Sequence, residues 1–109
     1  MEELGKAEKL VLGYIGHEYF GRIYFSTSGG KKPEEVIAKV IAEEITSDEK
    51  IQLRIRPKLE AAIKKLQEYW IIQLSGYEVK LTSYGQQLVA SLSKDEYSKL
   101  KEEAAKGNI

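Results

Sequence analysis

The sequence predicts a mostly helical α+β fold, built as one domain over residues 1–109. Apolar residues recur at helical spacing along most of the chain. Two short apolar runs flank Ser75 and Gly76, as expected for a β-hairpin. The length of 109 residues and the hydrophobic share of 42% suit a single core.

The first half of the chain is expected to hold a helix, a short strand and a second helix. Apolar residues from Leu4 to Ile15 fall near one helical face, so a helix is expected from residue 3 to about residue 20. Gly21 ends it, and the alternation in 22–26 predicts a short strand. A turn cluster then leads to Pro33, which suits the first turn of a helix reaching about residue 45.

Residues 46–69 carry the strongest helical pattern and one interruption. Thr46-Ser47-Asp48-Glu49 matches a capping box, which predicts that a helical segment starts there. Pro57 lacks an amide donor and disfavours a helical Arg56. We therefore expect a short segment over 47–55, a break at Arg56 and a main helix from Pro57 to Tyr69. A single kinked helix is the alternative.

The hairpin pattern allows a register to be predicted. A two-residue loop at Ser75-Gly76 places Ile72, Leu74, Tyr77 and Val79 on one apolar face. Gln73, Glu78 and Lys80 lie on the other face. The predicted partners are Leu74 with Tyr77, Gln73 with Glu78, Ile72 with Val79, and Ile71 with Lys80.

Two helices are expected after the hairpin. Thr82 can cap the first, which turns Leu88, Val89 and Leu92 inward. The sequence Ser93-Lys94-Asp95-Glu96 is a second capping box, and Gly107 ends the helix that follows it. The chain thus divides into a core over residues 1–92 and a C-terminal helix over residues 93–107.

The segment from Leu59 to Leu88, "LEAAIKKLQEYWIIQLSGYEVKLTSYGQQL", resembles the winged helix-turn-helix superfamily. In that superfamily an apolar strand follows the recognition helix at once, a hairpin wing comes next, and a Leu-Thr-x-x-Gly opens the last helix. Thr82 and Gly85 match that motif. The resemblance implies a fold with a short two-stranded wing and a C-terminal helix. It also implies that the helix from Pro57 to Tyr69 lies in the major groove of DNA.

Charge is balanced in the whole chain and concentrated in one segment. The chain has 17 basic and 17 acidic residues, which argues against binding nucleic acid by bulk charge. Between Lys50 and Leu66 there are six basic residues and one acid, a local charge of +5. The residues expected to contact DNA are Arg54, Arg56, Lys58, Ala61, Lys64, Lys65 and, in the wing, Lys80.

These observations predict a double-stranded DNA-binding protein, a transcriptional regulator that acts as a homodimer through its terminal helices. The alternative is a winged-helix adaptor that binds another protein and not DNA. Two departures from the superfamily favour the adaptor. Small repressors often carry Gly where this chain has Tyr69, and the expected connection over 46–56 is long.

Other functions find little support in the sequence. There is no Cys and His17 is the single His, so no metal site, cofactor or catalytic activity is expected. The Gly-rich loop before Pro33 fails the phosphate-loop pattern, which leaves anion binding at Gly29–Lys32 as a weaker reading.

The N-terminus is charged and no apolar run could span a membrane, so a cytoplasmic location is expected. The Lys- and Glu-rich composition is typical of a thermophile.

Overall fold

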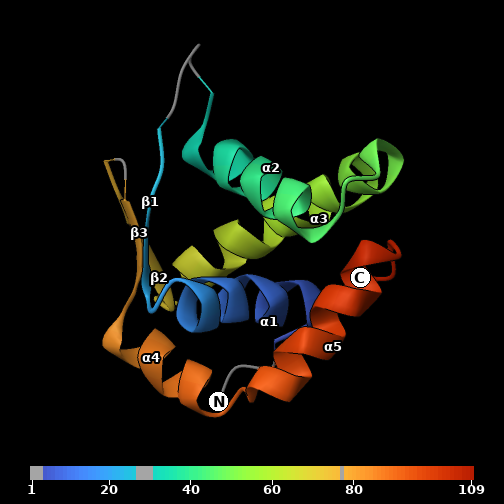
Figure 1. The fold of residues 1–109 in the computed structure, drawn as a ribbon. Helices are drawn as coiled ribbons and strands as arrows, with labels where there is room; N and C mark the ends of the chain where they lie inside the picture. Colours follow the sequence, from blue (N-terminus) through green and yellow to red (C-terminus); the bar gives the residue numbers. More distant parts are fainter. Residues whose placement is uncertain (1–3, 27–30, 77) are drawn as a thin grey trace.

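The computed structural model describes residues 4–26, 31–76 and 78–109. It is a mostly helical α+β structure, as the sequence predicts, with a small sheet along one edge of the helices (Figure 1). The elements are α1 Lys6–Gly13, the π-helix η1 Tyr14–Glu18, β1 Arg22–Tyr24, α2 Pro33–Ile45, α3 Glu49–Glu68, β2 Ile72–Ser75, β3 Glu78–Leu81, α4 Ser83–Ala90 and α5 Lys94–Ala105.

The sheet has three antiparallel strands in the order β1-β3-β2, where the sequence predicted a two-stranded wing. The strand expected over 22–26 forms as β1 and pairs with the outer edge of the hairpin, so that Ile23 lies opposite Val79. Ile23 is half-buried and Val79 fully buried, because both point toward the helices. Pairing with β1 gives β3 a partner on each side.

Helix α1 occupies the centre of the core. Its residues Leu10, Val11 and Leu12 are at most 1% exposed, and the first residues of η1, Tyr14 and Ile15, are at most 2% exposed. Six consecutive residues, from Leu10 to Ile15, are buried, so this part of the chain must be covered on every side. Figure 1 shows how this is done, with α2 and α3 on one side of α1 and α4 and α5 on the other.

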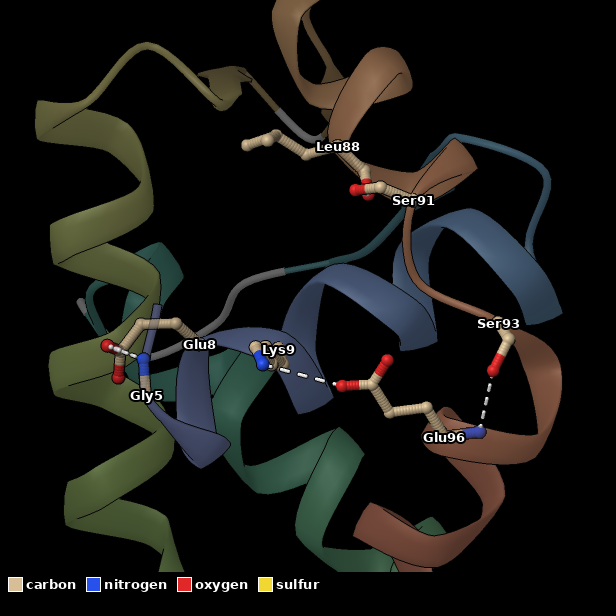
Figure 2. Close-up of polar contacts among 7 residues, drawn as sticks. All are labelled: Gly5, Glu8, Lys9, Leu88, Ser91, Ser93 and Glu96. Carbon is tan, nitrogen blue, oxygen red and sulfur yellow. Dashed lines mark hydrogen bonds and ion pairs between the residues drawn. The ribbon is translucent and has the colours of Figure 1, made fainter. Parts of the chain in front are cut away.

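Helix α5 folds back on its own chain. Its apolar residues Tyr97, Leu100 and Ala104 are 4%, 7% and 0% exposed. Its N-cap Ser93 accepts a hydrogen bond from the backbone N–H of Glu96, and the Glu96 carboxylate lies 3.4 Å from the Nζ of Lys9 (Figure 2). The apolar face that could have paired two copies is therefore occupied within one chain.

The prediction of a break at Arg56 is wrong. Helix α3 runs without interruption from Glu49 to Glu68 and contains Pro57. Pro57 is exposed, so the carbonyl group of Leu53 that loses its helical donor lies on the solvent side and can bond to water. The alternative of one helix through the proline is the better description of this segment.

The start of α3 also differs from the prediction. The N-cap is Asp48, whose carboxylate accepts from the backbone N–H of Lys50 at 2.9 Å. Thr46, the residue expected to cap, instead accepts a hydrogen bond from the N–H of Asp48. The connection between α2 and α3 is therefore only Thr46–Asp48, a tight turn and not the long segment expected over 46–56.

The hairpin register is displaced from the prediction by two residues. Leu74 pairs with Val79 and Ser75 with Glu78, so Ser75 belongs to the paired strand β2 and not to the loop predicted at Ser75-Gly76. Gly76, which follows β2, has φ +59°, the left-handed conformation that tight hairpin turns require. A shift by two residues keeps Ile72, Leu74 and Val79 together on the predicted apolar face. Tyr77, predicted to be in the core, lies outside the described residues.

Two non-glycine residues adopt left-handed backbone conformations at the same end of the sheet. Trp70, with φ +59°, follows α3, and its N–H bonds to the carbonyl of Gln67 while the N–H of Ile71 bonds to that of Leu66. This is the Schellman arrangement, which usually has Gly at the position of Trp70. Phe20, with φ +55°, precedes β1. Both side chains are exposed, at 75% and 92%.

Candidate nucleic-acid interface

Helix α3 presents an apolar side to the core and a long outer side to solvent. Ile55, Leu59, Ala62, Ile63 and Leu66 are buried along the inner side. The outer side carries the exposed residues Lys50, Leu53, Arg54, Pro57, Lys58, Ala61, Lys64 and Glu68. Four of the seven candidate DNA-contacting residues lie on this exposed surface, namely Arg54, Lys58, Ala61 and Lys64, while Arg56 and Lys65 are half-buried on its flanks.

The basic side chains of α3 do not form one continuous face. Arg54 and Lys58 point toward the C-terminal segment, where the Lys58 ammonium group donates to the backbone oxygen of Ile109. The Arg54 side chain packs against Gly107, whose added Cβ would lie 3.3 Å from the Arg54 Cδ. Figure 1 shows the end of α5 beside the first turns of α3.

Two lysines near the end of α3 are paired with carboxylates. The Nζ of Lys64 lies 3.6 Å from Glu60, one turn earlier on the same helix. The Nζ of Lys65 lies 3.3 Å from Glu8 of α1. The same Glu8 carboxylate accepts a hydrogen bond from the N–H of Gly5 at 2.9 Å, as Figure 2 shows. These partners reduce the positive charge that the two lysines present to an anion.

Arg56 lies on the opposite flank of α3, facing α2. It lines an open groove of about 470 Å³ together with Glu35, Glu43 and Glu60. Within the described part of the chain, no carboxylate comes within ion-pair distance of Arg56. The charge of this groove is therefore mixed. Arg56 faces α2, whereas Arg54 and Lys58 face the C-terminal segment on the other flank of α3.

The outermost line of α3, its crest, is formed by the apolar residues Leu53, Pro57 and Ala61, which the sequence did not reveal as a group. Leu53 is 65% exposed, and Pro57 and Ala61 follow it at four-residue spacing on the same exposed side. Leu53 lies off the spacing of the buried residues Ile55 and Leu59, and that mismatch is the signal that could have identified it. The crest is thus a short apolar stripe with Lys50, Arg54 and Lys64 beside it.

Lys80 lies on the outer face of the sheet, as predicted. It stands between Arg22 of β1 and Gln73 of β2 in the strand register. Arg22 adds a second basic residue on this face, although its Nε lies 3.0 Å from the carboxylate of Glu78. Sequence reasoning missed Arg22 because its neighbour Lys80 is 58 residues away in the chain.

Neither a metal site nor a membrane span emerges from the described residues. His17 is half-buried, and its Nε2 lies 2.6 Å from the backbone oxygen of Leu92, which gives the ring a structural role. Over residues 4–26, 31–76 and 78–109, no three His, Asp or Glu side chains converge as metal ligands do. No helix in these ranges is both long and apolar enough to cross a bilayer.

The arrangement as a whole is a tight α2–α3 turn, a helix with an exposed basic and apolar outer side, and a hairpin that follows it directly. Comparison with protein-family models, with curated proteins and with solved structures finds no match to this chain.

Proposed function

We propose that this protein is a winged-helix protein that binds double-stranded DNA and regulates transcription, with the outer side of α3 in the major groove. The order of elements supports the proposal: α1, β1, α2, a three-residue turn, α3 and then the β2–β3 hairpin. In helix-turn-helix proteins a short turn sets the second helix against the first so that its outer side can enter the groove. The turn Thr46–Asp48 is the observation that carries the proposal.

The charge of α3 gives further support. Helix α3 carries six basic residues and three acids, a net charge of +3 in a chain of net charge zero. Lys50 and Arg54 stand on the exposed outer side near the start of the helix, and neither has an ion-pair partner among the described residues. Side chains near the start of a recognition helix are those that contact base edges and nearby phosphates.

The direct test is a gel shift with duplex DNA at low salt. We expect a shift at micromolar protein that weakens at least tenfold in the double variant Lys50→Ala plus Arg54→Ala. The matched control is Lys94→Ala plus Lys99→Ala, which removes the same charge from exposed sites on α5. Absence of any shift, or equal weakening by both double variants, would contradict the proposal.

The second candidate is the adaptor function, in which α3 binds another protein. The exposed stripe of Leu53, Pro57 and Ala61 favours it, because apolar residues on the outer side of such a helix suit a protein partner. The discriminating result is a stable complex that forms without DNA and is lost in Leu53→Asp but kept in Leu53→Met. A gel shift with duplex DNA by a chain that forms no such complex would favour the first candidate.

The proposal includes a homodimer, which would let two copies read two half-sites. Because Tyr97, Leu100 and Ala104 are buried within the chain, the dimer contact would use other surfaces of the terminal helices. Sedimentation equilibrium at micromolar concentration measures this state. A mass of one chain without DNA, together with a mass of one chain plus one duplex when DNA is added, would remove the homodimer from the proposal.

A further inference from the structure

A surface pocket of about 440 Å³ lies where η1, α2 and α5 meet. It is lined by Tyr14, Glu18, Tyr19, Glu44, Ile45 and Lys101. This volume falls in the range of small-molecule sites. None of the residues proposed to contact DNA lines it.

A chain of hydroxyl groups in this pocket leads to a carboxylate. The Tyr14 hydroxyl, on a side chain only 2% exposed, lies 3.4 Å from the Tyr19 hydroxyl, which donates to Glu44 at 2.9 Å. Burial, and then the nearby Glu44 carboxylate, raise the pKa of Tyr14 far above its usual value. The Tyr14 hydroxyl therefore stays protonated and donates to the Tyr19 hydroxyl.

Glu44 carries the one charge in this pocket that lacks a counter-ion among the described residues. The other carboxylate, Glu18, accepts from the Tyr97 hydroxyl and from the Nζ of Lys101 at 3.2 Å, so the charges of Glu18 and Lys101 offset each other. The ion pairs of the described residues do not include Glu44. The pocket therefore has a net charge of −1, centred on Glu44.

The position of Glu44 in α2 adds to this negative potential. Glu44 and Ile45 are the last two residues of the helix, and a helix C-terminus carries partial negative charge. A cation placed beside the exposed Glu44 carboxylate would therefore be stabilised by both the side chain and the helix end. The rings of Tyr14 and Tyr19 stand beside it, with centroids 5.0 Å apart and planes inclined by 48°. Carboxylate and aromatic faces together are the groups that recognise ammonium ions.

The backbone supplies an independent indication. Tyr14 and Glu18 are the first and last residues of η1, a five-residue π-helix. π-Helical turns are rare and occur frequently at functional sites. Here the unusual turn supplies two of the six residues that line the pocket.

We propose that this pocket binds a small organic cation, with the ammonium group on the Glu44 carboxylate and the hydrocarbon part against Tyr19 and Ile45. An anion is disfavoured by the net charge of the pocket, and a neutral ligand would leave Glu44 without a counter-ion. The proposal does not depend on DNA binding by α3, because the two sites share no residue.

The test is an NMR titration of the labelled protein with n-butylamine, with tetramethylammonium and with n-butanol as the neutral control. We expect saturable shifts of the Tyr19, Glu44 and Ile45 amides with both cations and none with butanol. Glu44→Gln keeps the shape of the side chain and should weaken both cations at least tenfold. Glu43→Gln, which removes the same charge from the neighbouring exposed position, should leave binding unchanged.

A second variant separates the ring from the charge. Tyr19 is 38% exposed, so Tyr19→Leu should fold and should weaken tetramethylammonium at least threefold. Far-UV circular dichroism confirms the fold of each variant. The proposal is overturned if neither cation gives saturable shifts at millimolar concentration, or if Glu44→Gln and Glu43→Gln weaken binding equally.

Discussion

A Cβ atom added to Gly85 would lie 2.2 Å from the backbone carbonyl oxygen of Ile71. This contact is far inside van der Waals distance, and the oxygen belongs to the main chain that enters β2. The first turn of α4 is held against that strand by Thr82, whose N–H donates to the Ile71 carbonyl and whose hydroxyl group donates to the carbonyl of Trp70. The Gly of the Leu-Thr-x-x-Gly motif is therefore required by a close approach between two backbones.

Gly85→Ala should lower the free energy of unfolding by about 1–3 kcal/mol, the usual range for inserting a carbon where space is lacking. Urea denaturation followed by circular dichroism measures this. Gln86→Ala, at the next and exposed position of α4, is the control and should change stability little. Equal stability of Gly85→Ala and the parent protein would show that α4 can shift away from Ile71.

Trp70→Gly should stabilise the protein by about 1 kcal/mol, because a left-handed conformation costs a non-glycine residue roughly that much. The indole is 75% exposed, so little packing is lost with it. Trp70→Ala is the matched control, since it removes the same ring but keeps the Cβ. A gain in both variants would show that the ring itself destabilises the protein, whereas a loss in Trp70→Gly would show that the indole contributes packing.

Stability should fall as pH rises above about 10. Burial is the main reason that the pKa values of Tyr14 and Tyr97 lie far above the ordinary tyrosine value of about 10 in the folded state. Above that pH the unfolded chain loses protons that the folded chain keeps, so unfolding becomes easier. Each hydroxyl group contributes up to about 1.4 kcal/mol per pH unit.

The measurement is the free energy of unfolding between pH 9 and pH 11, by urea denaturation. Tyr97→Phe should reduce the slope against pH, because one of the two buried hydroxyl groups is gone. Tyr24→Phe, at a site that is 70% exposed, should leave the slope as it is. A slope that Tyr97→Phe does not alter would place the alkaline transition elsewhere in the molecule.

If α3 binds DNA, the salt dependence should be weaker than the sequence alone suggests. Six phosphate contacts would give a slope of about −5 for log affinity against log salt. Lys64 and Lys65 have carboxylate partners, which stay on the protein and offset them. Among the described residues, the four basic residues of α3 without a carboxylate partner are Lys50, Arg54, Arg56 and Lys58, and they give about −3.6 as the limit. Fluorescence anisotropy across a salt series measures the slope, and a value steeper than −5 would contradict this assignment.

Sequence periodicity predicted which residues are inside better than it predicted where elements end. Ile55, Leu59 and Ile63 were expected on the inner side of a helix and are fully buried. The helix boundary near Pro57 was wrong because a proline on the exposed side leaves its orphan carbonyl in water, and local rules do not say which side that is. The hairpin pairing was wrong for a related reason. Alternation has a period of two, so it cannot distinguish registers that differ by two residues.

The candidate sites depended more on tertiary contacts than the fold did. The spacing of α3 showed that Lys65 reaches its surface, but the partner Glu8 lies 57 residues earlier in the chain. The pocket beside Glu44 was missed altogether because Tyr14, Glu44 and Lys101 come from three separate elements. No local pattern in a single sequence links residues at such distances.

The strand order β1-β3-β2 also sets an order of assembly. Residues 33–81 contain α2, α3 and the hairpin, which can form from contacts that are close in the chain. Strand β1 has no partner until β3 exists, and the pair Arg22 and Lys80 closes a loop of 58 residues. Long loop closure is entropically costly and slows folding. The amides of β1 should therefore be the last of the sheet to gain protection from hydrogen exchange during refolding, and the first to lose it.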